Sequence, residues 1–177
     1  MTAAESAAAH AELSPEATRS RTVVWQDPVS VAGEGAAMAG IDYMRAIAGG
    51  ELPPPPIAVL MRMHPVSVEL GRVVFEGVPG EEHYNPIGTV HGGYAATLLD
   101  SVLGCAVHTT LDAGVGYSTA GLEVKFLRPI TRELASVRAT GEVAHRGRRQ
   151  ATANALLTDP VGGGLLASAT TTCLILG

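Results

Sequence analysis

One segment, residues 92–111, constrains the fold of this chain of 177 residues more than any other. It has the length of a helix, and apolar side chains would occupy nearly the whole circumference of that helix, among them Leu98, Leu99, Val102 and Leu103. Such a helix is stable only when it is buried. Because the chain is about as long as one ordinary domain, we expect its other elements to wrap around this single helix.

Strand-like segments rich in apolar residues lie on both sides of the helix. Short turns, marked by Pro129, Gly147 and a run of three glycines, separate the last four strands and favour antiparallel pairing. The order of two strands, one helix and four strands predicts an α+β fold, with a curved antiparallel sheet wrapped around one helix. The expected strands are residues 57–70, 72–78, 116–128, 133–145, 150–158 and 165–176.

The chain before residue 57 has a different character. Residues 1–34 hold few large apolar side chains, so we expect a disordered or loosely packed extension. Residues 35–56 follow as a short amphipathic helix, at 36–48, and a proline-rich lead-in that holds the chain extended up to the first strand. The predicted folded domain is residues 57–177.

Composition excludes several classes of function. The 17 Asp and Glu residues outnumber the 12 Lys and Arg residues, which gives a net charge of −5, so nucleic acid is not an expected partner. A signal peptide and a membrane span are not expected either. We therefore expect a cytoplasmic protein, in which Cys105 and Cys173 serve as small buried hydrophobic residues.

Three residues of the long helix have unusual chemistry for their positions. Gly92 and Gly93 open the helix, which suggests a close approach to the backbone, and free amides at a helix start attract oxygen that gains negative charge. Asp100 is a carboxylate in an apolar helix and hence a candidate catalyst. Gly93 and Asp100 are about 10.5 Å apart along the helix axis, whereas a polarised acyl carbonyl must lie within about 3–3.5 Å of the group that attacks it. If both act, they come from two subunits of a twofold dimer with antiparallel helices.

Two stretches carry a specific resemblance. Residues 85–100 read NPIGTVHGGYAATLLD, and residues 117–129 read YSTAGLEVKFLRP. They resemble the hotdog-fold acyl-CoA thioesterases, in particular the phenylacetate-pathway (PaaI-like) group of the 4-hydroxybenzoyl-CoA thioesterase superfamily, with its His-Gly-Gly motif and an acidic residue nine positions after the histidine. The resemblance extends from about Ile57 to the C-terminus. It implies a hotdog fold, a six-stranded antiparallel sheet around one long central helix, with the sheets of two subunits joined edge to edge.

The resemblance also implies roles for five residues. Asp100 corresponds to the nucleophile or general base, and Gly92 to the amide that polarises the thioester carbonyl. Asn85 and His91 correspond to a polar pair on the partner side of the site. Thr119 corresponds to a hydroxyl that helps to hold water, and neighbouring Ser118 would take that place if the register shifted by one residue.

Substrate binding is expected to involve cations that contact the phosphates of coenzyme A. The hairpin with Arg146, Arg148 and Arg149 is the first choice, and Lys125 and Arg128 are the second. Gly93 is placed with the substrate-binding residues, and Tyr84 and Tyr94 are pocket candidates. No metal and no cofactor are expected, since coenzyme A is part of the substrate.

The expected function is hydrolysis of an aromatic or medium-chain acyl-CoA thioester by a homodimer, or by a dimer of dimers. The alternative is a non-catalytic acyl-CoA-binding protein with the same fold. A hotdog hydratase would need a different histidine-containing loop, and a Cys105–His108 pair lacks an orienting acid. The acyl group, and coenzyme A against acyl carrier protein, stay open.

Overall fold

The computed structural model describes residues 18–177. The expectation of a disordered or loosely packed extension falls partly on residues 1–17, outside the described residues. Residues 18–27 form no helix or strand, but helix α2 spans Pro28–Ala36, where no helix was expected. Its start carries two ordinary signals: the Asp27 carboxylate accepts a hydrogen bond of 3.0 Å from the Val29 amide, and a proline begins the helix. The domain boundaries themselves stay a prediction.

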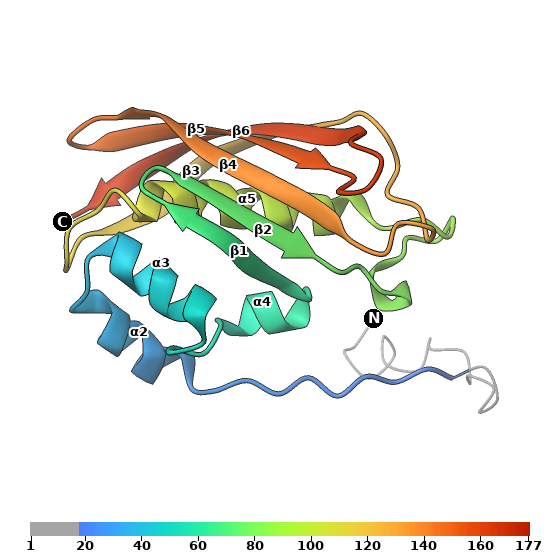
Figure 1. The fold of residues 1–177 in the computed structure, drawn as a ribbon, viewed down its shortest axis with the longest axis horizontal. Coiled ribbons are helices and arrows are strands. Elements are labelled where there is room, and N and C mark those ends of the chain that lie inside the picture. The colour runs from blue at the N-terminus through green and yellow to red at the C-terminus, as the bar shows by residue number, and fades with distance from the viewer. Residues whose placement is uncertain (1–17) are drawn as a thin grey trace, which may run out of the picture.

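The fold is one antiparallel sheet of six strands packed on a long helix, as Figure 1 shows. Helix α5, Gly92–His108, contacts β2, β3, β4, β5 and β6, and its side chains Leu99, Val102 and Leu103 are fully buried. This arrangement confirms the predicted hotdog fold. The strands are β1 (Met63–Glu69), β2 (Arg72–Gly77), β3 (Gly116–Phe126), β4 (Val137–Arg146), β5 (Gln150–Thr158) and β6 (Leu165–Leu176).

The order of the strands differs in one respect from a simple succession of hairpins. The order across the sheet is β1-β2-β4-β5-β6-β3, so β3 pairs with β6 and not with β4. The connection at residues 127–136 contains Pro129 and is long enough to carry the chain across two strands. As a result β3 is an edge strand, and one side of it has no strand partner among the described residues.

The segment before the sheet also corrects the expected lead-in. Helix α3, Gly40–Gly49, lies close to the expected position and ends at Gly50, whose φ of 78° suits glycine. The first strand was expected from residue 57, but helix α4 spans Pro56–Leu60 and β1 begins only at Met63. A proline at the first helical position favours a helix start, and this signal outweighed the extended proline run. Both helices contact β1, and α3 also contacts α5.

No helix within residues 18–177 is long and apolar enough to cross a bilayer.

Candidate active site

The start of α5 presents one free backbone amide. His91 is the N-cap residue, and its Nδ1 atom accepts a hydrogen bond of 2.8 Å from the Gly93 amide. The Gly93 amide is therefore engaged, whereas the structure assigns no acceptor within residues 18–177 to the Gly92 amide. Phe126 lies against this glycine, since a Cβ atom added to Gly92 would be 3.3 Å from the ring. The Gly92 amide is thus available to a carbonyl oxygen at the positive end of the helix dipole.

Asn85 organises the loop that leads into α5. Its Oδ1 atom accepts hydrogen bonds of 3.1 Å from the amides of Ile87 and Thr89, and its Nδ2 atom donates one of 2.8 Å to the Thr89 hydroxyl. The His91 amide fixes the end of this loop, because it donates a hydrogen bond of 2.8 Å to the His83 carbonyl. Asn85 and His91 therefore belong to one loop that positions the start of α5, but only His91 lines the cavity at this helix start, so their role as a polar pair stays a prediction.

A cavity of about 300 Å³ lies against this helix start. Its walls are His91 and Gly92 on one side and residues 126–130 on the other, with Leu157 and Ala167 at its base. Phe126 is 57% exposed and Leu127 is 54% exposed, so the entrance is apolar and open to solvent. We call this space the glycine cavity.

Asp100 lies in a second cavity, of about 290 Å³, which we call the acid cavity. The Thr119 hydroxyl donates a hydrogen bond of 3.0 Å to Asp100 Oδ1, and both residues line this cavity. Neighbouring side chains of a strand point to opposite faces, so Thr119 and not Ser118 reaches the carboxylate. The pairing of β3 with β6 shifts register between Thr119 and Gly121, a local irregularity at the site.

The two cavities have no wall residue in common. Gly92 and Asp100 are eight positions apart on α5, about 12 Å along the axis at 1.5 Å per residue. A single copy of the chain therefore holds the amide and the carboxylate too far apart to act on one carbonyl group. This separation agrees with the expectation that the two groups meet across two subunits.

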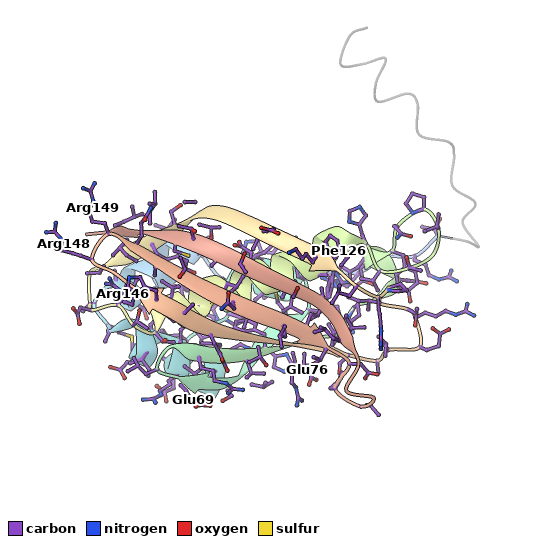
Figure 2. The ribbon with its side chains drawn as sticks, turned by 90° about the horizontal axis from the view of Figure 1, so that it is seen from above. Glu69, Glu76, Phe126, Arg146, Arg148 and Arg149 are labelled. Atoms are coloured by element: carbon purple, nitrogen blue, oxygen red, sulfur yellow. The ribbon has the colours of Figure 1, made fainter. Side chains whose placement is uncertain are left out.

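The arginine hairpin lies away from the glycine cavity within one copy of the chain. Figure 2 shows Arg146, Arg148 and Arg149 at one end of the sheet and Phe126 toward the other. The pairing agrees, because Phe126 lies opposite the start of β6, whereas the hairpin adjoins its end. Arg148 and Arg149 are exposed, and Arg146 contacts the Gly147 carbonyl.

The second-choice cations lie nearer to the glycine cavity. Arg128 lines it directly, and within the described residues its guanidinium forms no ion pair. Lys125 is on β3 beside Phe126 and forms an exposed ion pair of 3.3 Å with Glu123. Of the five cations considered, only Arg128 is a wall residue of a cavity that contains catalytic candidates.

Three further residues were considered from the sequence: Tyr94, Tyr84 and Cys105. Tyr94 is buried and lines neither cavity, and its hydroxyl has no partner within residues 18–177. Tyr84 likewise lines neither of the two cavities. Burial raises the pKa of the Cys105 thiol to about 12, so this thiol is protonated at neutral pH and unsuited to act as a nucleophile. Among the residues described here, no cluster of three or more His, Cys, Asp or Glu could hold a metal ion.

Sequence patterns did not reveal that α3 and α4 form part of the acid cavity. Tyr43, Met44 and Ile47 of α3 and Ala58 of α4 are wall residues. The helical spacing of apolar residues at 36–48 predicted that α3 would bury one face. This spacing could not predict that the buried face of α3 would cover the acid cavity, since the other walls of the cavity are distant from α3 in the sequence.

Comparisons with known proteins point to one family. The model of the thioesterase superfamily matches residues 87–165. Human acyl-coenzyme A thioesterase 13 is 32% identical over 109 residues, which cover 62% of this chain and 76% of the relative. A phenylacetic acid degradation-related protein of Ralstonia eutropha JMP134 has a TM-score of 0.68 and 30% identity, over 75% of this chain and 98% of that one. A Streptococcus mutans UA159 protein, solved with acetyl CoA, has a TM-score of 0.59 and 26% identity, over 65% and 89%.

Proposed function

Since the chain belongs to the thioesterase superfamily and is a thioester hydrolase, we propose that it hydrolyses acyl-CoA thioesters to a free acid and coenzyme A. The observation that carries the proposal is the Asp100 carboxylate, hydrogen-bonded to Thr119 at 3.0 Å and lining a cavity of about 290 Å³. The relative named as an acyl-coenzyme A thioesterase and the neighbour solved with acetyl CoA support the choice of carrier.

The reaction requires few groups. The Gly92 amide donates a hydrogen bond to the carbonyl oxygen as it gains negative charge, and the helix dipole adds to this stabilisation. Asp100 acts as the nucleophile or as the general base that takes a proton from water, while Thr119 holds one carboxylate oxygen and leaves the other free. The oxygen of water, or of the Asp100 carboxylate itself, forms a bond to the carbonyl carbon. The bond from carbon to sulfur then breaks, and the thiolate departs with little acid assistance because thiol pKa values are about 8.5. If Asp100 is the nucleophile, water then hydrolyses the anhydride and restores the carboxylate. No metal or cofactor enters this chemistry.

The active unit we propose is a dimer joined through β3. One side of this strand has no strand partner within residues 18–177, and its exposed apolar residues include Leu122 and Phe126. Antiparallel pairing of two β3 edges, with the α5 helices also antiparallel, would place Asp100 of one copy beside Gly92 of the partner subunit. Each dimer would have two equivalent sites, and two dimers would assemble as a tetramer.

The cations are assigned by position. We propose that Arg128, at the glycine cavity, contacts the pantetheine or phosphate part of coenzyme A as it enters. Arg146, Arg148 and Arg149 stay candidates for the nucleotide phosphates, reached from the partner subunit, with Lys125 as a lesser contributor. The Gly93 amide is occupied by His91 Nδ1, which counts against the predicted substrate contact of Gly93. The exposed, unpaired character of Arg148 and Arg149 among the described residues favours such a role.

The test is thiol release from a panel of aromatic and aliphatic CoA esters. We expect turnover by the native protein and a loss of about 10²- to 10⁴-fold in Asp100→Asn, with the far-ultraviolet circular dichroism unchanged. Glu51→Gln removes an exposed carboxylate that lines neither cavity and serves as the matched control, with activity within about twofold.

Two outcomes would overturn the proposal. Full turnover by Asp100→Asn would exclude this carboxylate. Binding of acyl-CoA by the native protein without any release of thiol would favour the alternative of a non-catalytic acyl-CoA-binding protein.

A further inference from the structure

The short 3-10 helix η1, Glu81–His83, holds the start of α5 in two places. The His83 carbonyl accepts the hydrogen bond of 2.8 Å from the His91 amide, and the centroid of the His83 ring lies 4.8 Å from that of the Tyr94 ring. His91 is the N-cap residue of α5, and Tyr94 is in the first turn of this helix. Because these two residues flank Gly92 in the sequence, the direction of the Gly92 amide depends on the position of η1.

The helix η1 is itself held by a charge cluster, which consists of Arg21, Arg62 and Glu82. Both arginines pair with the same carboxylate oxygen, Oε1 of Glu82, and the Arg62 pair measures 3.6 Å. Arg21 also donates to two carbonyls at the end of α4. The three side chains are between 28% and 42% exposed, so solvent screens these pairs less than fully exposed ones. The charge cluster thus joins the N-terminal segment and the end of α4 to η1.

Arg62 takes its place in the charge cluster at a conformational cost. Its φ of 51° is the only positive φ of a residue other than glycine within residues 18–177. A left-handed backbone is unfavourable for arginine and persists only where the surroundings enforce it, which is common near functional sites. The Arg62 carbonyl accepts a hydrogen bond of 2.9 Å from the Val78 amide. Gly80 leaves room for the ion pair, because a Cβ atom there would collide with both the Glu82 carboxylate and the Arg62 guanidinium.

We propose that Glu82 is a positioning residue for the hydrolysis, which acts through η1 and His91 to keep the Gly92 amide directed into the glycine cavity. The inference rests on the proposed thioesterase function. Glu82 lines neither the glycine cavity nor the acid cavity, so it acts without contact to substrate. A donor that is fixed in advance stabilises the developing negative charge better than one that must reorient. Since Arg21 supplies part of the charge cluster, the N-terminal segment contributes to turnover.

The first experiment measures thiol release by Glu82→Gln, which removes the charge and keeps the shape of the side chain. We expect kcat to fall about three- to tenfold with KM within about twofold, because the amide acts mainly in the transition state. Glu81→Gln is the matched control in the same helix. The ion pair of Glu81 with Arg19 is exposed, at 63% and 70%, so its loss should change kcat by less than about twofold. Equal losses in both variants would overturn the inference.

Combination with Gly92→Pro separates positioning from a general loss of stability. If Glu82 acts through the Gly92 amide, Glu82→Gln should have no further effect on kcat once this amide is absent. All four proteins are assayed well below their melting temperatures. A loss by the same factor in both backgrounds would overturn the inference, since Glu82 would then act independently of the amide.

Amide hydrogen exchange, followed by nuclear magnetic resonance, tests the same link without any turnover. The His91 amide should exchange about fivefold faster in Glu82→Gln than in the native protein, and at the native rate in Glu81→Gln. Unchanged exchange at His91 in Glu82→Gln would overturn the inference. Absence of thiol release by the native protein would instead count against the proposed function, and the exchange rates would still show whether Glu82 holds the start of α5.

Discussion

Thr119 and Ser118 are neighbours on β3, but only Thr119 contacts Asp100. Thr119→Val keeps the shape of the side chain and removes the hydroxyl that donates to the carboxylate. Because a hydrogen bond to a charged group contributes about 1.5–3 kcal/mol, we expect kcat/KM to fall about 10- to 100-fold. Steady-state thiol release measures the change. Ser118→Ala is the control and should stay within about twofold; the reverse order of effects would contradict the register described for this strand.

Gly92 allows its amide to be removed without disturbing the helix. The residue is at the first helical position, where proline is favoured, and the preceding His91 has a ψ of 138°, which suits a residue before proline. Gly92→Pro deletes the N–H group that we assign to the thioester oxygen, so kcat should fall about 10²- to 10³-fold with little change in melting temperature. Gly92→Ala has a similar Cβ but retains the amide. Equal losses in both variants would indicate a steric effect on Phe126 and contradict the assignment.

At the scale of elements, residues 18–27, α4 and the 3-10 helix η1, Glu81–His83, meet at Glu82, whose carboxylate pairs with both Arg21 and Arg62. Arg21 pairs with Glu82 and donates to the carbonyls of Val59 and Leu60 at the end of α4. Partial burial acts to raise the pKa of Glu82, but hydrogen bonds from its own backbone and from Arg21 outweigh this effect and lower the pKa below its ordinary value. The contact thus ties the N-terminal segment to the loop that precedes the site.

A group with a lowered pKa in the folded state stabilises the protein above its ordinary pKa, and this stability is lost as the pH falls through the lowered value. Glu82→Gln should therefore reduce the melting temperature at pH 7, by up to about 3 °C, and the difference from the native protein should disappear in strong acid. Thermal unfolding followed by circular dichroism over this pH range measures both effects. Glu51→Gln, at an exposed position, is the control. A difference that grows toward acid would have the wrong sign.

Local sequence patterns predicted the helices and strands better than they predicted which of these elements pack against each other. The periodicity of residues 92–111 predicted α5, and apolar segments between turn residues predicted six strands, although the first was placed six residues too early, because both signals are local. The same patterns could not place β3 at the edge or α3 over the acid cavity, since these contacts join distant parts of the chain. Asp100 and Gly92 stood out by their residue types in an apolar helix, and the motif resemblance implied their roles. The contact of Arg128 with the glycine cavity needed three-dimensional structure.

At the scale of the whole molecule, the division of the site between two cavities leads to a test of the dimer. Asp100→Asn lacks the carboxylate, and Gly92→Pro lacks the amide, so each homodimer should be inactive. A dimer with one chain of each kind would contain one site with both defects and one intact site, made of Asp100 from one copy and Gly92 from the other. Doubly purified mixed dimers should therefore have about half of the native activity, whereas an unfractionated mixture, in which random pairing makes half of the dimers mixed, should have about a quarter.

Coexpression of the two variants with different affinity tags, followed by thiol-release assays on doubly purified dimers, measures this recovery. Mixed dimers of the native chain with an Asp100→Asn, Gly92→Pro double variant are the complementary case: each shared site would then lack one group, so these dimers should be inactive. If each copy contained a complete site, the outcome would be inverted, because the first mixture would stay inactive and the second would retain half of the native activity. Recovery in the first mixture alone therefore requires that a carboxylate and an amide from different copies act on the same thioester.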